Sequence, residues 1–339
     1  MSGQIIANRP NAGDYEERDS MDTFEIGGFR EAVVIVTQIE PHLAAWLEVG
    51  GWELRHQGAV DAAILAAWGC PGVEAQEWLV AHPQCDTGLV RLVRLADAGE
   101  RPQIRSDDQC WDTGGIFDLN VRVLAVDEKA AALRRQGWHG ASPPIQWDFG
   151  MVNVKEWLAK GPDNLRLAVI ERVAPPLQGF EHLRDFSQVF NSSQIVCDME
   201  RALAFYCGVL GFQNTYQYQA AAFPAGANVF GLPAEAAAQA GLHINIVHPQ
   251  GKMEGSIELV TLPGAQGLDL STDARPPNTG MAVLRFPVHG MAAFERHLRH
   301  AGVTPAFTRR RAQLAPHGEV ELLGLRAPDG AWLEFYGAK

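Results

Sequence analysis

The sequence has no long apolar run and no signature of export. No uninterrupted apolar stretch reaches the roughly 18 residues that a helix needs to cross a bilayer, so no membrane-spanning helix is predicted. The polar start, residues 1–24, lacks the apolar core of a signal peptide and is predicted to be a loosely packed tail. Five scattered cysteines without C-x-x-C spacing favour free thiols and a cytoplasmic location.

Positive charge and several common motifs are also scarce. The chain has 28 Lys and Arg against 40 Asp and Glu, a formal net charge of −12. This balance argues against nucleic acid or an anionic membrane as a partner, because both attract basic surfaces. The sequence has no G-x-G-x-x-G after a strand, no G-x-x-x-x-G-K-[ST], no G-x-S-x-G and no H-E-x-x-H. Dinucleotide-binding, P-loop, serine-hydrolase and zinc-protease chemistry therefore receive no support.

The sequence does contain a repeated unit, written most clearly in residues 192–212, SSQIVCDMERALAFYCGVLGF. Alternating residues predict a strand up to Cys197, and Asp198 then stands at a helix N-cap position. Apolar residues follow at helical spacing until Gly211, which suits the left-handed residue after a helix. Strand, capped helix, glycine and a return to strand make one βα unit.

This unit appears four times along the chain. Residues 28–52 repeat the layout of residues 192–212, and residues 112–137 match residues 278–302. A proline-rich bridge follows the second unit. We therefore predict a tail at 1–24, an N-terminal domain at 25–173, a linker at 174–185 and a C-terminal domain at 186–339, with two βαβββ modules in each domain.

The helix block DMERALAFYCGVLGF and the closing PDGAWLEFY, with weaker echoes elsewhere, resemble the vicinal oxygen chelate superfamily. This superfamily includes glyoxalase I, extradiol dioxygenases and bleomycin- and fosfomycin-resistance proteins. The resemblance covers nearly the whole chain after the tail. It implies an α+β fold in which four βαβββ modules pair into two open β-barrel-like domains, with a ligand or metal ion inside. A module signature of this kind is specific for fold but not for reaction.

Metal ligands in the family lie on the first strand of a module, usually His, and on the last strand, usually Glu. In the C-terminal domain these positions fall on Asn191, on Val283 or Met281, and on Glu258 and Glu334. Both glutamates stand in otherwise apolar strands, which is costly unless the carboxyl group is paired, protonated or bound to an ion. Glu258 and Glu334 are thus the candidate metal ligands, and a divalent ion is left open as cofactor.

The corresponding positions of the N-terminal domain hold Glu31, Arg91, Asp118 and a residue near Ala168. We interpret the three charged residues as an internal ion network rather than a ligand site. Neither domain has the His-His-Glu set of a ring-cleaving dioxygenase.

Further candidates lie on other strands. His243 and Asn245 are two residues apart and face the same side of one strand. If that side is the barrel interior, His243 serves as a ligand or general base and Asn245 contacts the substrate; otherwise His243 is a core histidine bonded to a neighbour. Trp332 and Tyr216 are candidates to line a pocket for an aromatic ligand, although core packing explains such residues equally well.

The leading hypothesis is an enzyme that acts on a small hydrophobic or aromatic molecule in the C-terminal barrel. Glu258 and Glu334 would form an acid/base pair for isomerase or lyase chemistry, with or without a divalent ion, because two close carboxyl groups split their pKa values. Asn191 would orient a substrate oxygen. The alternative is a non-catalytic protein that sequesters its ligand, and an extradiol dioxygenase is a third reading. The expected partner is a small molecule, and a homodimer is left open.

Overall fold

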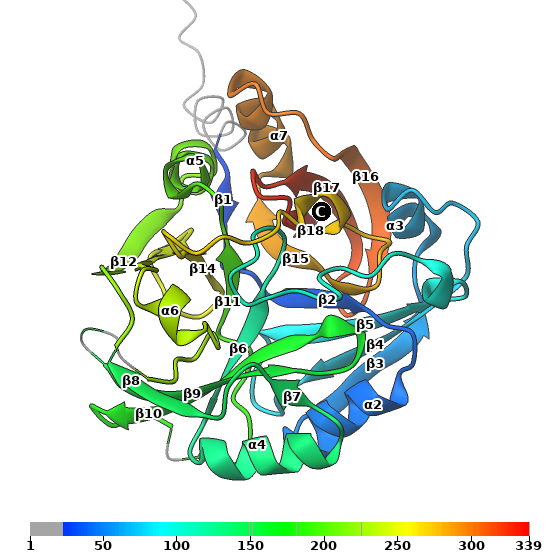
Figure 1. The fold of residues 1–339 in the computed structure, drawn as a ribbon. Helices are drawn as coiled ribbons and strands as arrows, with labels where there is room; N and C mark the ends of the chain where they lie inside the picture. The colour runs from blue at the N-terminus through cyan, green and yellow to red at the C-terminus, as the bar shows by residue number, and fades with distance from the viewer. Residues whose placement is uncertain (1–22, 149, 151, 181, 225, 339) are drawn as a thin grey trace, which may run out of the picture.

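The computed structural model describes residues 23–148, 150, 152–180, 182–224 and 226–338. Within these residues the chain forms two nine-stranded curved sheets with short helices packed around them (Figure 1). Four βαβββ modules supply the strands, so the predicted α+β fold is confirmed. The predicted tail lies outside the described residues except for its last two, and the five cysteines are free. No described helix is both long and apolar enough to span a bilayer.

Modules one and two make up the first half of the chain. Module one contains β2 (Glu31–Ile35), α2 (Glu40–Leu43), η1 (Ala44–Val49), β3 (Glu53–Ala59), α3 (Ala62–Ala67), β4 (Ala75–Ala81) and β5 (Leu89–Leu95). Module two contains β6 (Asp118–Val123), α4 (Val126–Arg135), β7 (His139–Gly140), β8 (Ile145–Asp148), β9 (Asn153–Lys160), η3 (Pro162–Asn164) and β10 (Arg166–Ala174). A 3-10 turn, η2 (Ala98–Glu100), lies between them.

Modules three and four make up the second half. Module three contains β11 (Asn191–Ile195), α5 (Met199–Leu203), η4 (Ala204–Val209), β12 (Gln213–Ala220), α6 (Ala234–Ala237), β13 (Leu242–His248) and β14 (Ser256–Thr261). Module four contains β15 (Gly280–His289), α7 (Met291–His300), β16 (Phe307–Leu314), β17 (Gly318–Arg326) and β18 (Trp332–Ala338). The turn η5 (Ser271–Asp273) connects them, and β1 (Glu25–Ile26) pairs with β15.

The first helix of module three forms as its sequence predicts. The Asp198 side chain accepts a hydrogen bond from the Arg201 backbone amide at 3.0 Å, which caps one of the free amides at the helix start. After Leu203 the helix widens into the π-helix η4, and Gly211 follows with a φ of +74°. That left-handed conformation turns the chain into β12 and would strain any residue with a side chain.

Each module pairs its first strand in parallel with its last, and the modules then join through their first strands. The antiparallel pair β6–β11 unites modules two and three, whereas β2–β15 unites modules one and four. We call the first sheet the inner barrel (residues 118–174 and 191–261) and the second the outer barrel (residues 31–95 and 280–338). Each barrel takes one module from each predicted domain, so 25–173 and 186–339 are not two separate barrels. Repeat similarity identifies the modules, but it does not say which first strands will pair.

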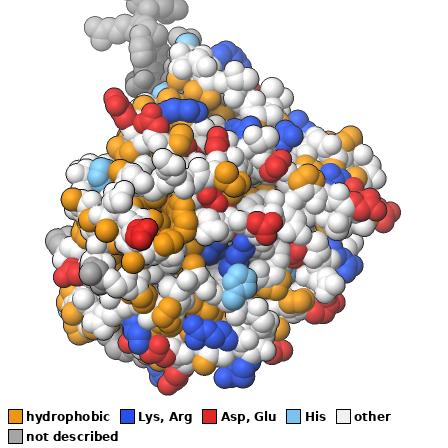
Figure 2. All heavy atoms as spheres, in the orientation of Figure 1, with side chains coloured by type: hydrophobic (Ala, Val, Ile, Leu, Met, Phe, Trp, Pro, Cys, Tyr) orange, Lys and Arg blue, Asp and Glu red, His pale blue; other side chains and the backbone are white. Residues whose placement is uncertain are grey.

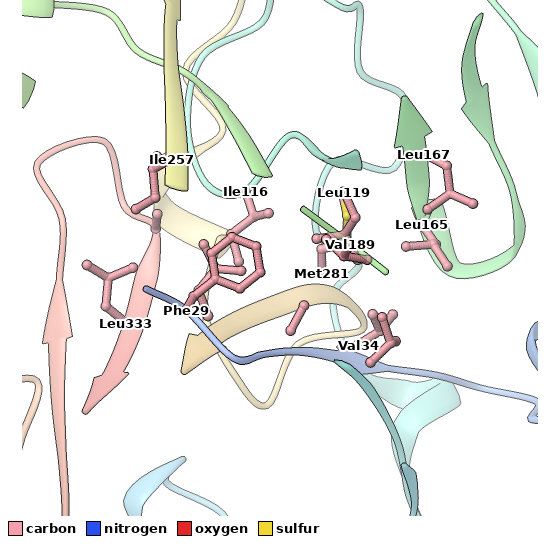
Figure 3. Close-up of a cluster of buried hydrophobic side chains, with 14 of the residues drawn as sticks. Phe29, Val34, Ile116, Leu119, Leu165, Leu167, Val189, Ile257, Met281 and Leu333 are labelled. Carbon is pink, nitrogen blue, oxygen red and sulfur yellow. The ribbon is translucent and has the colours of Figure 1, made fainter. Parts of the chain in front are cut away.

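The main core lies between the two barrels. The outward faces of both sheets pack there against the helices, and α4 lies beside η1 while α7 lies beside η4. Figure 3 shows part of this core, built from side chains far apart in sequence: Phe29, Val34, Ile116, Leu119, Leu165, Leu167, Val189, Ile257, Met281 and Leu333. The concave face of each sheet encloses a separate interior, one in the inner barrel and one in the outer barrel.

Candidate functional site

The inner barrel encloses a cavity of about 230 Å³ on its concave face. Its walls are mainly apolar and aromatic, and hydrophobic side chains gather on the face of the molecule near α6 and β14 (Figure 2). The aromatic and sulfur-containing lining residues are Phe117, Trp147, Phe190, Tyr216, Phe230 and Met253. Such a cavity suits a small hydrophobic ligand oriented by a few polar groups.

Three carboxyl groups from three strands line this cavity: Asp118 on β6, Glu156 on β9 and Glu258 on β14. Each belongs to the set of residues that alternate inward along its strand. In β9, for example, Val154, Glu156 and Leu158 all line the cavity. Asp118 and Glu156 are 2% and 9% exposed.

The apolar setting changes the acidity of all three groups. Burial, followed by the nearby charge of Asp118, raises the pKa of Glu258 to about 8. Burial, and then the charges of Glu258 and Asp118, raise the pKa of Glu156 to about 8 as well. Burial raises the pKa of Asp118 to about 6, although hydrogen bonds from Ser193 lower it. Near neutral pH this site therefore holds both protonated and ionised carboxyl groups.

Two asparagines lie at the junction of the two modules, where Asn191 and Asn120 face each other across β11 and β6. Asn191 Nδ2 donates to Glu258 Oε2 at 3.4 Å, and Asn120 Nδ2 donates to Ser193 Oγ at 3.4 Å. Within the described residues the Oδ1 atoms of both asparagines are buried without a hydrogen-bond partner. Buried amide oxygens are normally satisfied, so these two acceptors are available to donors on a ligand.

Trp147 and Tyr216 close the sides of the cavity. Trp147 Nε1 donates to Glu156 Oε2 at 3.0 Å, which favours the ionised form of that carboxyl group. Tyr216 lies on β12 opposite Ile246 of β13 and lines the cavity.

The interior of the outer barrel is built differently, from a cluster of paired charges. Arg91 binds Glu31 through two hydrogen bonds of 2.8 Å and Glu77 through one of 2.6 Å. Arg285 donates to Glu31 at 2.7 Å and to Glu334 at 2.7 Å. Burial would raise the pKa of Glu31, but the charges of Arg91 and Arg285 outweigh it and hold that pKa at about 2. The predicted network of Glu31 and Arg91 is thus present, whereas Asp118 lies in the other barrel.

Glu334 belongs to this charged cluster and does not meet Glu258. Besides Arg285, it accepts hydrogen bonds from Trp68 Nε1 at 2.6 Å and from Trp332 Nε1 at 3.3 Å. Glu258 lies on β14 of the inner barrel and Glu334 on β18 of the outer barrel. The expected pairing of these two carboxylates in one site is therefore wrong, and Trp332 packs in the outer barrel, away from the cavity. The cause is the module pairing, which places the third and fourth modules in different sheets.

His243 and Asn245 share one side of β13, as expected, but that side faces away from the cavity. Ile244 and Ile246, which alternate with them, line the cavity instead. Asn245 is 5% exposed and accepts a hydrogen bond from Asn214 Nδ2 at 2.8 Å. Neither residue contacts the cavity, so their expected roles in catalysis and substrate binding are not supported by their position.

The residues present do not reproduce a metal centre of the family type. Within the described residues, no three His, Cys, Asp or Glu side chains converge closely enough to hold an ion. Around the inner cavity, Glu258 stands beside Asn191, and Ala168, which lies opposite Asn120 on the neighbouring strand β10, offers no ligand atom. In the outer barrel, the carboxylate of Glu334 is already bound by Arg285 and two tryptophans. Glu258 and Glu334 therefore do not form the expected metal site.

Sequence reasoning missed Glu156 and Asn120. Glu156 carries a weaker form of the signal that pointed to Glu258, because the strand NVKEWLAK is apolar only on the face that Glu156 shares with Val154 and Leu158. Asn120 is two residues beyond Asp118 on the same face of β6. Both residues could have been found by following the alternation from Asp118 and Glu258 outward.

Comparison with known proteins agrees with the fold. Residues 182–335 match the model of the Glyoxalase/Bleomycin resistance protein/Dioxygenase superfamily. The structure is similar to glyoxalase I from Zea mays, with a TM-score of 0.57 and 14% identity over 96% of this chain and 95% of that one. It is also similar to a putative dioxygenase from Bacillus subtilis, with a TM-score of 0.54 and 11% identity over 92% of this chain and 86% of that one. No curated protein matches the sequence. At these identities the structural likeness establishes the fold alone.

Proposed function

Because the chain belongs to the glyoxalase/bleomycin resistance protein/dioxygenase superfamily, we propose that it is an enzyme that binds a small hydrophobic or aromatic molecule in its inner barrel. The proposed reaction is a proton transfer assisted by carboxyl groups, of the isomerase or lyase type. One observation carries the proposal: Glu156 and Glu258 share an apolar cavity with pKa values near 8. Groups that titrate close to the working pH are effective general acids and bases.

The roles of the two glutamates follow from their neighbours. Glu258 in its ionised form accepts a hydrogen bond from Asn191, which fixes the orientation of that carboxylate. It would remove a proton from a carbon next to a carbonyl group of the substrate. Glu156 in its protonated form would deliver a proton to the carbonyl oxygen or to the neighbouring carbon. Mutual repulsion disfavours ionisation of both groups at once, so the form with one ionised and one protonated carboxyl group is populated around their pKa values of about 8.

Asn120 and Asn191 would hold the substrate in position. Their Oδ1 atoms are buried and without a partner among the described residues, so each can accept a hydrogen bond from a hydroxyl or amine group of the ligand. The apolar walls formed by residues such as Ile170 and Val260 exclude water from the reacting carbon. Exclusion of water strengthens each of these polar contacts.

The test is deuterium uptake from D2O into a panel of aryl ketones and aryl hydroxyketones, followed by proton NMR. We expect the wild-type protein to exchange the proton next to the carbonyl group, and Glu258→Gln and Glu156→Gln to slow that exchange by at least about 100-fold. Glu74→Gln, which changes an exposed glutamate, is the matched control. Unchanged exchange in both cavity variants would remove the two glutamates from the mechanism.

Sequestration of a ligand is the second candidate, and the predominance of apolar side chains around the cavity favours it. A sequestering protein would bind members of the same panel and release them chemically unchanged and undeuterated. Calorimetry combined with the exchange experiment therefore separates the two functions.

A further inference from the structure

In the inner barrel, two neighbouring strands each have an arginine as the last residue on the side that faces the cavity. On β6, Asp118, Asn120 and Arg122 point to the same side, and on β10, Ile170 and Arg172 do so. The parallel register pairs Ile170 with Arg122, so both arginines lie at one end of the cavity. Four residues of strand, or about 13 Å, separate Arg122 from Asp118 at the other end.

Arg172 lines the cavity and is half-buried. Among the described residues it forms no ion pair and no hydrogen bond through its side chain, although burial lowers its pKa. Its neighbour across β9 is Val154, an apolar residue. A partly desolvated guanidinium without a carboxylate is costly, and an anionic ligand group would offset that cost.

Arg122 adds a second cationic group at the same end. It is 8% exposed and lies over the ring of Phe190, a lining residue of the cavity, at 3.7 Å from the centroid. Its Nη1 atom is buried and has no hydrogen-bond partner within the described residues. Glu254 approaches Arg122 at 3.3 Å, but that side chain is 44% exposed, so solvent screens the pair.

We propose that the ligand of this cavity carries a carboxylate, which binds between Arg122 and Arg172 at the arginine end. Its apolar body lies along the aromatic walls, and its far end reaches the carboxyl groups of Glu258 and Asp118. The two ends of the cavity thus select an elongated molecule with one anionic group and one neutral reactive group. This inference rests on the proposed function for the choice of cavity, but it concerns binding and not turnover.

The test compares acids with their neutral isosteres. Benzoate, phenylacetate and 2-naphthoate are titrated into the full-length protein by calorimetry at neutral pH, beside benzamide, phenylacetamide and 2-naphthamide. At least one acid is expected to bind about 10-fold or more tightly than its amide, since a charge-assisted contact of this kind contributes about one power of ten. Arg172→Gln is expected to remove that preference and to leave the Kd of the amide within about two-fold. Arg311→Gln, which removes an exposed charge from the outer barrel, should leave the preference intact.

Arg122→Lys keeps the charge but loses the fork of donors, and we expect a partial loss of the preference for the acid. The inference is overturned if no acid binds, if amides bind as tightly as acids, or if Arg172→Gln weakens both equally. Deuterium exchange in neutral ketones is independent of these outcomes. If the protein catalyses deuterium exchange but binds acids no more tightly than amides, only the inference of a carboxylate site is wrong. If acids bind more tightly in an arginine-dependent way but no exchange occurs, only the proposed reaction is wrong.

Discussion

Arg285 donates a hydrogen bond from Nε to Oε2 of Glu334 over 2.7 Å, and the two side chains are 1% and 0% exposed. These residues lie directly opposite each other in the outer barrel, where β15 pairs with β18. The equivalent pair in the inner barrel, between β6 and β10, is Asn120 and Ala168. The same fold therefore fills one interior with paired charges and keeps the other open, with carboxyl groups that lack a strong cationic partner.

Removing the carboxylate of Glu334 should destabilise the protein. Glu334→Gln is expected to lower the free energy of unfolding by about 3 kcal/mol, because Arg285 then keeps a buried charge with one partner fewer. Urea denaturation measures this change. Glu74→Gln, at an exposed position, should stay within about 0.5 kcal/mol of wild type. A Glu334→Gln protein of normal stability would show that the charged cluster does not support the fold.

Stability should fall as the pH rises from mildly acidic to mildly alkaline values. The carboxyl groups of Glu156 and Glu258 have an ordinary pKa of 4.5 and titrate at about 8 in the folded protein. The folded state therefore binds these protons more tightly than the unfolded state. This stabilisation is fully present below about pH 4.5 and is lost as the pH rises through about 8.

Glu31 acts in the opposite direction, because its pKa is held at about 2. Its contribution is present above about pH 4.5 and is lost as the pH falls towards 2. Maximum stability is thus expected near pH 5. Urea midpoints measured from pH 4 to 9 check this, and Glu258→Gln should flatten the decline on the alkaline side. Parallel curves for the variant and the wild type would contradict the raised pKa of Glu258.

The sequence was sufficient to predict the modules but not their partners. The Asp198 cap and the glycine at 211 are local signals, and the structure confirms both. Pairing between first strands depends on long-range contacts, such as those of Asn191 with Asn120, and no local pattern specifies them. The wrong prediction that Glu258 and Glu334 share one site follows from this missing information about which first strands pair.

The candidate site was predicted in part for the same reason. Glu258 and Asn191 lie within one module, and their proximity to each other was expected from strand positions alone. Glu156 reaches the cavity from the third strand of its module, a position that carries no ligand in the family pattern. His243 shows the converse, since alternation along β13 identified its neighbours but could not decide which face was inward.

The module pairing predicts which fragments can fold. Residues 113–266 contain both modules of the inner barrel, whereas residues 186–339 contain one module from each barrel. We expect 113–266 to unfold cooperatively, at a lower temperature than the full chain because part of its core faces the outer barrel. Residues 186–339 should show no cooperative transition by circular dichroism. The reverse result would support two independent halves of the chain.

Trp147 is expected to tune the acidity of Glu156. Its Nε1 donates to Glu156 Oε2 at 3.0 Å, and this hydrogen bond lowers the carboxyl pKa against the effects of burial and nearby charge. Trp147→Phe keeps an aromatic wall but removes the donor, so the pKa of Glu156 should rise above its value of about 8. Carbon-13 NMR of labelled glutamate carboxyl groups measures that titration directly. Trp111→Phe removes a donor that bonds to the Gln266 backbone instead, and it should leave the titration unchanged. A Glu156 pKa that stays constant in Trp147→Phe would show that burial and the neighbouring carboxylates alone set the acidity of this site.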